Sequence, residues 1–183
     1  MSTADPQLKS WTREEYYRMG DAGLFHDQRV ELIDGEILTM SPMKAAHAVA
    51  IGLVTAAMRA VFGPGYWIRV QLPLVLGTES EPEPDVAVVP GEPRDYPEHP
   101  TTALLLIEIS DTTLSFDRGR KCALYAEFCV PEYWIVNLLD RQVEVYRDPV
   151  DGEYQTRKSF DSDEELSPLA APAASVPVSD LLP

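Results

Sequence analysis

Apolar positions and capping signals along the chain predict helices in three segments. Thr12 and Glu15 have the spacing of a capping box at the start of the first. Ser41-Pro42 is typical of an N-cap followed by a first helical residue, and beyond it apolar residues recur at helical spacing as far as Val61. The predicted helices are residues 11–19, residues 41–62 and residues 117–128.

Short runs rich in apolar and β-branched residues predict strands between these helices. Asp34-Gly35 is a dipeptide typical of a two-residue hairpin turn and separates the first two strands. The run Ala103–Ser110 is apolar on both faces, as expected of a central strand. The predicted strands are residues 29–33, 36–40, 66–76, 84–89, 103–110, 132–137, 142–147 and 154–160.

This order of elements predicts an α/β fold, a mixed sheet flanked by helices. The 183 residues have the length of one compact domain, and 45% hydrophobic with 25% charged residues is an ordinary globular composition. We therefore expect a single domain over residues 1–183. From about Asp161 the chain is acidic and then rich in Ala, Pro and Ser, which predicts a loosely held tail.

Two further patterns predict a cytoplasmic protein without a membrane partner. The longest uncharged apolar stretch, Ala45–Met58, is too short to span a bilayer, and residues 1–10 lack the apolar core of a signal peptide. Cys122 and Cys129 would lie about 10.5 Å apart along a helix, too far to form a disulfide. We interpret both as buried, reduced thiols.

The net charge is unusual and disfavours nucleic acid as a partner. Fifteen Lys and Arg stand against thirty Asp and Glu, a net charge of −15, whereas proteins that neutralise phosphates carry basic surfaces. The acids are clustered, however, and one cluster comprises Glu79, Glu81, Glu83 and Asp85. Such a cluster can bind a divalent metal, which removes part of its charge.

Glu108 is the most unusual residue for its surroundings, because it lies near the end of the apolar run 103–110. An ionised carboxylate buried there costs several kcal/mol unless it is paired or bound to a metal. The alternative is a strand end at which Glu108 meets water or an arginine. Asp85 lies at the start of the predicted strand 84–89. It is either a turn residue or, if this strand is a neighbour of the strand 103–110, a second carboxylate that binds the same Mg²⁺ as Glu108.

Three other polar residues stand among apolar neighbours. Lys121 lies on the apolar face of the third helix. Either its side chain is directed towards the carboxylate site, or it extends its ammonium to solvent. Glu31 can reach the same site or pair with Arg29 or Arg69. His47 lies in the apolar stripe of the second helix, as a functional group or as a satisfied core histidine.

Taken together, these motifs resemble the Uma-two family, whose members are restriction-endonuclease-like proteins of the PD-(D/E)xK superfamily. The resemblance covers residues 11–160 and rests on Arg29-Val30-Glu31-Leu32-Ile33-Asp34-Gly35-Glu36, His47, Glu83-Pro84-Asp85-Val86, Ile107-Glu108-Ile109-Ser110, Asp117-x-x-x-Lys121-x-x-x-Tyr125 and Glu132-Tyr133-Trp134-Ile135-Val136. It implies a restriction-endonuclease-like core.

The resemblance also implies roles for individual residues. Asp85 and Glu108 match the two acids that hold Mg²⁺ or Mn²⁺ in the superfamily. Ser110 stands where the superfamily has a lysine that orients the attacking water, and Lys121 on the following helix is the matching position in this family. Asp85, Glu108 and Lys121 are thus the expected catalytic residues, and the expected supporting residues are Glu31, His47, Ser110 and Tyr125.

The implied activity is Mg²⁺-dependent hydrolysis of phosphodiester bonds in DNA by a homodimer. Tyr133, Trp134 and the last two strands are candidates for the dimer contact. The alternative is a catalytically degenerate member of the same fold that acts as a homodimeric interaction module. The net charge favours the module, and the complete acid and lysine set favours the nuclease. A glycosidase ranks third because no aromatic sugar platform stands out.

A basic groove leading to Asp85 would separate these alternatives. The residues available to line one are Arg13, Arg18, Lys44, Arg59, Arg69, Arg118 and Arg120.

Overall fold

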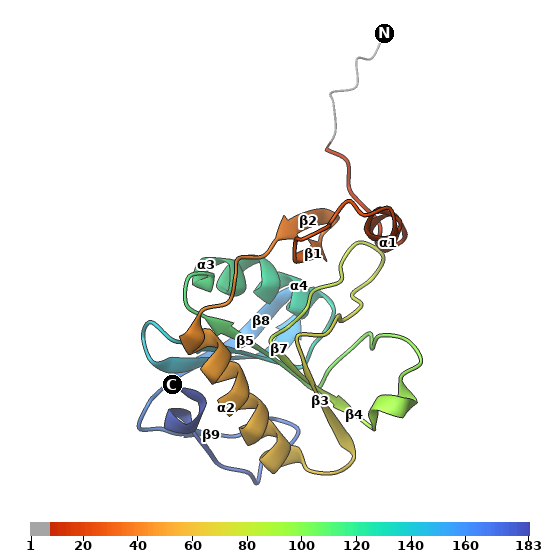
Figure 1. Cartoon of the computed structure of the whole chain (residues 1–183). Coiled ribbons are helices and arrows are strands. Elements are labelled where there is room, and N and C mark those ends of the chain that lie inside the picture. Colours follow the sequence, from red (N-terminus) through yellow and green to blue (C-terminus); the bar gives the residue numbers. More distant parts are fainter. Residues whose placement is uncertain (1–7) are drawn as a thin grey trace.

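The computed structural model describes residues 8–183, and it begins with a helix and a hairpin at one end of the molecule (Figure 1). Helix α1 (Arg13–Asp21) starts at the predicted capping box. The Thr12 side chain accepts a hydrogen bond from the Glu15 N–H, and the Glu15 carboxylate accepts one from the Thr12 N–H at 3.0 Å. The prediction of a helix at this place is confirmed.

The hairpin that follows is also confirmed. β1 (Val30–Ile33) pairs antiparallel with β2 (Glu36–Thr39). Asp34 and Gly35 between them have φ angles of 50° and 71°, the positive values that a two-residue hairpin turn requires. The hairpin places Glu31 in a fully buried strand that lies against the rest of the fold.

Six strands form the central sheet in the order β3-β4-β5-β6-β7-β8. Only β5 and β6 are parallel, so the sheet is mixed as predicted. The strands are β3 (Tyr66–Val70), β4 (Val86–Pro90), β5 (Leu105–Ser110), β6 (Glu132–Asn137), β7 (Gln142–Val150) and β8 (Glu153–Asp161). The two most buried strands, β5 and β6, lie at its centre.

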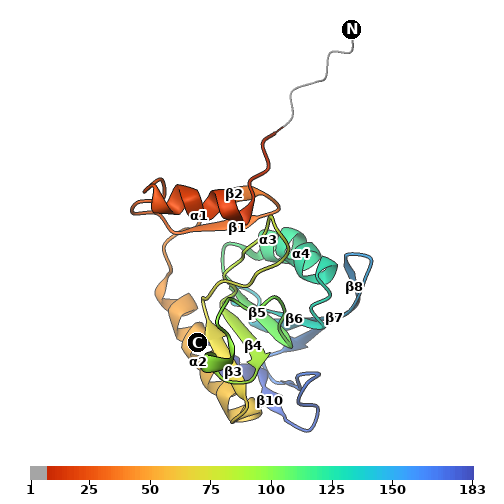
Figure 2. The ribbon, with the colours of Figure 1, turned by 90° about the vertical axis from the view of Figure 1, so that its right-hand side faces the viewer.

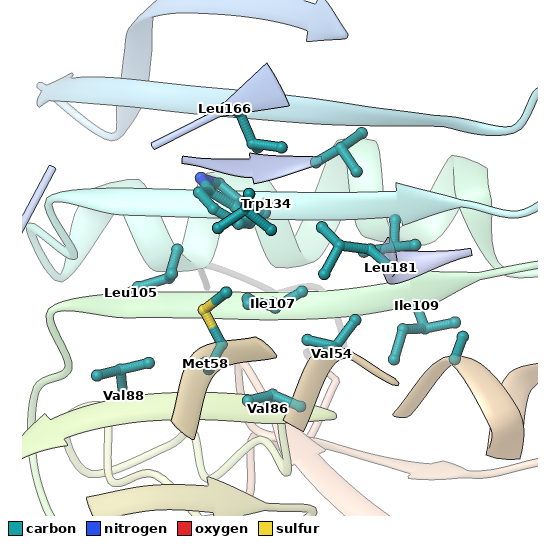
Figure 3. Close-up of a cluster of buried hydrophobic side chains, with 14 of the residues drawn as sticks. Val54, Met58, Val86, Val88, Leu105, Ile107, Ile109, Trp134, Leu166 and Leu181 are labelled. Carbon is teal, nitrogen blue, oxygen red and sulfur yellow. The ribbon is translucent and has the colours of Figure 1, made fainter. Parts of the chain in front are cut away.

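Helix α2 (Ala45–Phe62) covers one face of this sheet (Figures 1 and 2). Val54 and Met58 of the helix pack with Ile107 of β5 and Trp134 of β6 (Figure 3). A second core on the opposite face contains Leu124 and the buried tyrosines of the last helix and of the sheet. The predicted α/β fold, a mixed sheet flanked by helices, is confirmed.

Three predicted boundaries were wrong. Helix α2 starts at Ala45 with Lys44 as its N-cap, so Ser41-Pro42 belongs to the preceding loop. Strand β3 ends at Val70 because Gln71 has a φ of 48°, which interrupts an extended strand. The third helix begins earlier than predicted, as α3 (Leu114–Phe116), and continues through the π-helical turn η2 (Asp117–Lys121) into α4 (Cys122–Glu127).

The segment after Asp161 differs from the expected loosely held tail. It forms the short pair β9 (Glu165–Leu166) and β10 (Val176–Pro177) and the 3₁₀ turn η3 (Val178–Leu181), which lies beside α2 (Figure 1). Its apolar side chains are buried in the same core as Trp134; they are Leu166, Val176, Val178, Leu181 and Leu182. Although Ala, Pro and Ser are common in this segment, these few large apolar side chains are enough to pack it against the core.

Two expectations about surfaces also need correction. Helix α2 is in fact long and apolar enough to cross a membrane by length and composition, with a mean hydropathy of 1.6 over 18 residues. In the fold, its side chains at Ala50, Val54 and Met58 are fully buried against the sheet. Both cysteines are free thiols as predicted, but neither is fully buried: Cys122 is half-buried and Cys129 is exposed. Another 3₁₀ turn, η1 (Pro93–Asp95), lies in the proline-rich loop after β4.

Candidate active site

The predicted site residues gather around one pocket at the edge where β4 begins and β5 ends. Asp85 directly precedes Val86, whose partner in β5 is Ile107, so Asp85 and Glu108 lie at the same end of neighbouring strands. The pocket has a volume of about 210 Å³. The charged side chains that line it, together with His47 and Gln71, are Arg29, Glu31, Lys44, Glu83, Asp85, Glu108, Asp111, Asp117 and Lys121.

Asp85 is held by three hydrogen bonds from three parts of the fold. Oδ1 lies 3.1 Å from His47 Nε2 and accepts a bond of 3.1 Å from the Gln71 amide, while Oδ2 accepts one of 2.9 Å from the Ile109 N–H. Burial raises the pKa of Asp85, but His47 and the Ile109 N–H outweigh it and hold the pKa below its usual value. Asp85 is therefore a fixed, ionised carboxylate on the pocket wall.

Glu108 is buried, with 3% of its surface exposed. Its Oε1 accepts hydrogen bonds from Lys121 Nζ at 2.9 Å and from the Tyr125 hydroxyl at 2.7 Å. Burial raises the pKa of Glu108, whereas the charge of the neighbouring Lys121 acts in the opposite direction and favours the carboxylate. Both bonds fall on Oε1, and no donor from the described residues reaches Oε2.

Lys121 is directed into this site, so it does not extend its ammonium to solvent. Only 2% of the residue is exposed, and its Nζ also lies 3.5 Å from Glu31 Oε2. Burial lowers the pKa of Lys121, but the negative charges of Glu108 and Glu31 outweigh burial and raise it. These neighbouring carboxylates therefore favour the charged ammonium form of Lys121.

The π-helical turn explains how Lys121 reaches Glu108 from the following helix. A π turn adds a residue to the helical repeat and often occurs at functional sites. Its first residue, Asp117, accepts hydrogen bonds from Ser110 and from the Thr113 hydroxyl, the latter at 2.7 Å. The Tyr133 hydroxyl donates to the Asp117 carbonyl at 3.2 Å. Ser110 at the end of β5 thus anchors the turn that carries Lys121.

Glu31 and His47 reach the pocket rather than their alternative partners. Glu31 Oε2 is buried without a hydrogen bond and its nearest cation is Lys121, while Arg29 pairs with Glu83 at 3.1 Å. Burial raises the pKa of Glu31. His47 lies at the start of α2, half-buried at the pocket rather than in the core, and its bond to Asp85 raises its pKa.

Two residues of the site were missed from the sequence. Gln71 was assigned to the interior of a strand, where a single polar residue carries no signal of its own. Its positive φ ends β3 and lets the amide reach Asp85. Asp117 was noted as part of a motif but not as a site residue, although its spacing of four from Lys121 places both on one turn.

The family model that matches this chain covers residues 13–179 and is described as Uma2, "Putative restriction endonuclease". The chain belongs to the Uma2 family. The resemblance inferred from the sequence motifs is thereby confirmed. A search of curated proteins returned no match.

A solved structure supports the same fold for this Uma2 chain. It is a crystal structure from Anabaena variabilis described as a putative nuclease belonging to DUF820. The two chains superpose with a TM-score of 0.72 at 18% identity, over 93% of this chain and 96% of the other. The Uma2 chain therefore shares its fold with that protein.

The metal-binding and DNA-binding features expected of the site are less complete. Among residues 8–183, no three His, Cys, Asp or Glu side chains cluster closely enough to hold a metal ion. Of the seven basic residues proposed to line a groove, only Lys44 lines this pocket. Arg118 and Arg120 instead pair with acids of the fold, Glu144 for the former and Asp34 and Glu36 for the latter.

Proposed function

We propose that this Uma2 protein is an endonuclease that hydrolyses DNA phosphodiester bonds with Mg²⁺ or Mn²⁺ held by Asp85 and Glu108. The observation that carries the proposal is the position of Lys121, whose ammonium lies 2.9 Å from Glu108 across the same pocket. The strand position that holds lysine in the superfamily is Ser110, and Lys121 supplies the missing cation from the helix. Two acids and an amine thus converge where the resemblance requires them.

The donor set fits a hard divalent cation. Mg²⁺ prefers oxygen ligands and is commonly bound by one or two carboxylates, completing its shell with waters and substrate phosphates, so a three-residue cluster is not needed. Glu108 Oε2 has no donor among the described residues, and the buried Glu31 Oε2 also lacks a hydrogen bond. We infer that Asp85 and Glu108 are the ligands and that Glu31 supports them.

The chain's own residues then divide the work. A divalent ion at this place would neutralise charge on the phosphate and make a bound water more acidic. His47, Gln71 and the Ile109 N–H hold the Asp85 carboxylate in one orientation. Lys121 stays protonated, so it acts as a fixed positive charge that positions the water or stabilises the transition state. Tyr125 holds the Glu108 oxygen that Lys121 also contacts.

Cleavage of plasmid DNA tests the proposal. We expect nicking or linearisation with Mg²⁺ or Mn²⁺, none with EDTA, and at least 100-fold slower cleavage by Asp85→Asn. Asp163→Asn is the matched control, because Asp163 is an exposed aspartate outside the pocket. Equal cleavage by the wild type and Asp85→Asn would show a contaminating nuclease and refute the assignment.

One observation favours the second candidate, a homodimeric interaction module without turnover. The net charge is −15, and several cations proposed for a groove are already neutralised by acids of the fold. This candidate predicts no cleavage of any DNA by a folded, dimeric protein. We also propose that the chain is a single domain, that it forms a homodimer and that it acts in the cytoplasm.

A further inference from the structure

A second hollow lies on the other side of the end of β3 and shares no lining residue with the first pocket. Its volume is about 450 Å³, within the range of sites for small ligands. We call it the Arg69 pocket; its lining residues are Arg13, Tyr17, Trp67, Arg69, Leu72 and Tyr96, with Pro97, Glu98 and His99 at the loop after η1.

Arg69 is a buried cation without a counter-ion. Only 2% of the residue is exposed. The guanidinium donates one hydrogen bond, from Nη2 to the Pro73 carbonyl at 2.7 Å. Its Nε is buried and has no partner among residues 8–183. No carboxylate of these residues forms an ion pair with it. A buried, unpaired guanidinium costs several kcal/mol, so the fold retains here a group that an anion would satisfy.

Arg13, the other arginine that lines the pocket, has the counter-ion that Arg69 lacks. Arg13 forms an ion pair with the buried Glu81, which also accepts the Tyr17 hydroxyl. Glu81 therefore balances Arg13 and leaves Arg69 unbalanced. Glu98 is exposed on the rim of the pocket and forms no ion pair with Arg69.

Aromatic rings stand beside the free guanidinium. The Arg69 guanidinium lies over the Trp67 ring at 4.4 Å, and the Trp67 and Tyr96 ring centroids are 5.7 Å apart. The Tyr96 hydroxyl donates to the Pro90 carbonyl, which fixes that ring in the wall of the pocket. A positive charge next to aromatic side chains matches a ligand with a negative group and a flat ring.

We propose that the Arg69 pocket binds a nucleotide, with the phosphate on the Arg69 guanidinium and the base against Trp67 and Tyr96. The nucleotide is either free or one unit of a nucleic acid strand, since both carry the same phosphate and base. The pocket takes this ligand without metal and without cleavage, so the proposal stands independently of the nuclease assignment at Asp85.

Calorimetry with deoxyadenosine monophosphate (dAMP) in EDTA tests the proposal on the full chain. We expect dAMP to bind the wild type, and deoxyadenosine and inorganic phosphate each to bind roughly tenfold more weakly or not at all, because each satisfies half of the site. Arg69→Met removes the charge and is expected to weaken dAMP binding roughly tenfold or more. Arg94→Met, an exposed arginine of η1 outside the pocket, is the matched control and keeps the wild-type affinity.

A second variant keeps the test decisive if Arg69→Met does not fold. Tyr96→Leu removes one ring and is expected to weaken dAMP binding about fivefold or more by lost stacking. Asp85→Asn should bind dAMP as the wild type does, which separates this pocket from the first. The proposal is wrong if dAMP does not bind the wild type, or if it binds both variants with wild-type affinity.

Displacement identifies the source of the nucleotide. A short single-stranded oligonucleotide without terminal phosphates displaces dAMP if the pocket takes one unit of a strand. If the pocket takes free nucleotides, dAMP binds and the oligonucleotide does not compete. Both outcomes support a nucleotide site at Arg69.

Discussion

Replacing Lys121 by methionine should damage both the stability of the fold and the proposed chemistry. The ammonium is 2% exposed and lies 2.9 Å from Glu108 and 3.5 Å from Glu31. Removing one partner of a buried ion pair costs about 3–5 kcal/mol. The methionine keeps most of the buried stem, and Glu108 keeps its bond to Tyr125 at 2.7 Å. We therefore expect a loss of about 3 kcal/mol, the lower end of that range.

Two measurements separate the two effects. A loss of about 3 kcal/mol corresponds to a decrease in Tm of roughly 6–12 °C for a chain of this length, measured by calorimetry. Cleavage per folded molecule, assayed well below that Tm, should decrease roughly 100-fold, as when one transition-state donor is removed. Lys158→Met on β8 is the matched control, because this lysine lies on an exposed strand position outside the pocket.

A double variant tests whether the charge pair itself is the cause. Adding Glu108→Gln to Lys121→Met removes both charges of this pair, so Tm should recover by more than half while cleavage does not recover. Wild-type cleavage per folded Lys121→Met molecule would refute a catalytic role for Lys121. An unchanged Tm would refute the buried ion pair.

Three further outcomes are expected. Light scattering at micromolar concentration should give about twice the 20.4 kDa of one chain, and a mass near 20 kDa would end the homodimer proposal. Hydrogen bonds from Arg118 and Tyr146 outweigh burial and hold the pKa of Glu144 below its usual value, so the ionised Glu144 stabilises the fold at any pH above the ordinary glutamate pKa. This stabilisation is lost as the pH falls through the lowered pKa of Glu144. The Tm should therefore fall less steeply in acid for Glu144→Gln than for the wild type, and equal slopes would contradict this. Gln71→Leu should weaken Mn²⁺ binding roughly 10-fold through loss of the Asp85 contact, and calorimetry showing unchanged affinity would count against it.

Local signals in the sequence were sufficient for most of the fold. The capping box at Thr12 and the turn at Asp34-Gly35 each depend on neighbouring residues alone, and both were found where predicted. The apolar run of β5 correctly indicated a central strand. The end of β3 was missed because a positive φ at Gln71, a residue type that rarely adopts it, is imposed by contacts with the rest of the fold.

Long-range features of the site and its surfaces were harder to predict. Lys121 was placed on the correct face, but the π-helical turn that directs it to Glu108 depends on Asp117 meeting Ser110 at the end of β5. Tyr133 and Trp134 were considered for the dimer contact, yet both are fully buried, so the exposed edge strand β8 is the remaining candidate from that proposal. The presence of aromatic side chains in a sequence does not by itself predict which of them are buried in the core.

Calorimetric titration of the wild type with Mn²⁺ tests the central claim most directly, because it needs no DNA and no turnover. The account predicts saturable binding of Mn²⁺ by the wild type and its loss in both Asp85→Asn and Glu108→Ala. Asp163→Asn, which changes an exposed aspartate outside the pocket, should bind as the wild type does. Unchanged Mn²⁺ binding in Asp85→Asn and Glu108→Ala would contradict the assignment of these two carboxylates as the metal ligands.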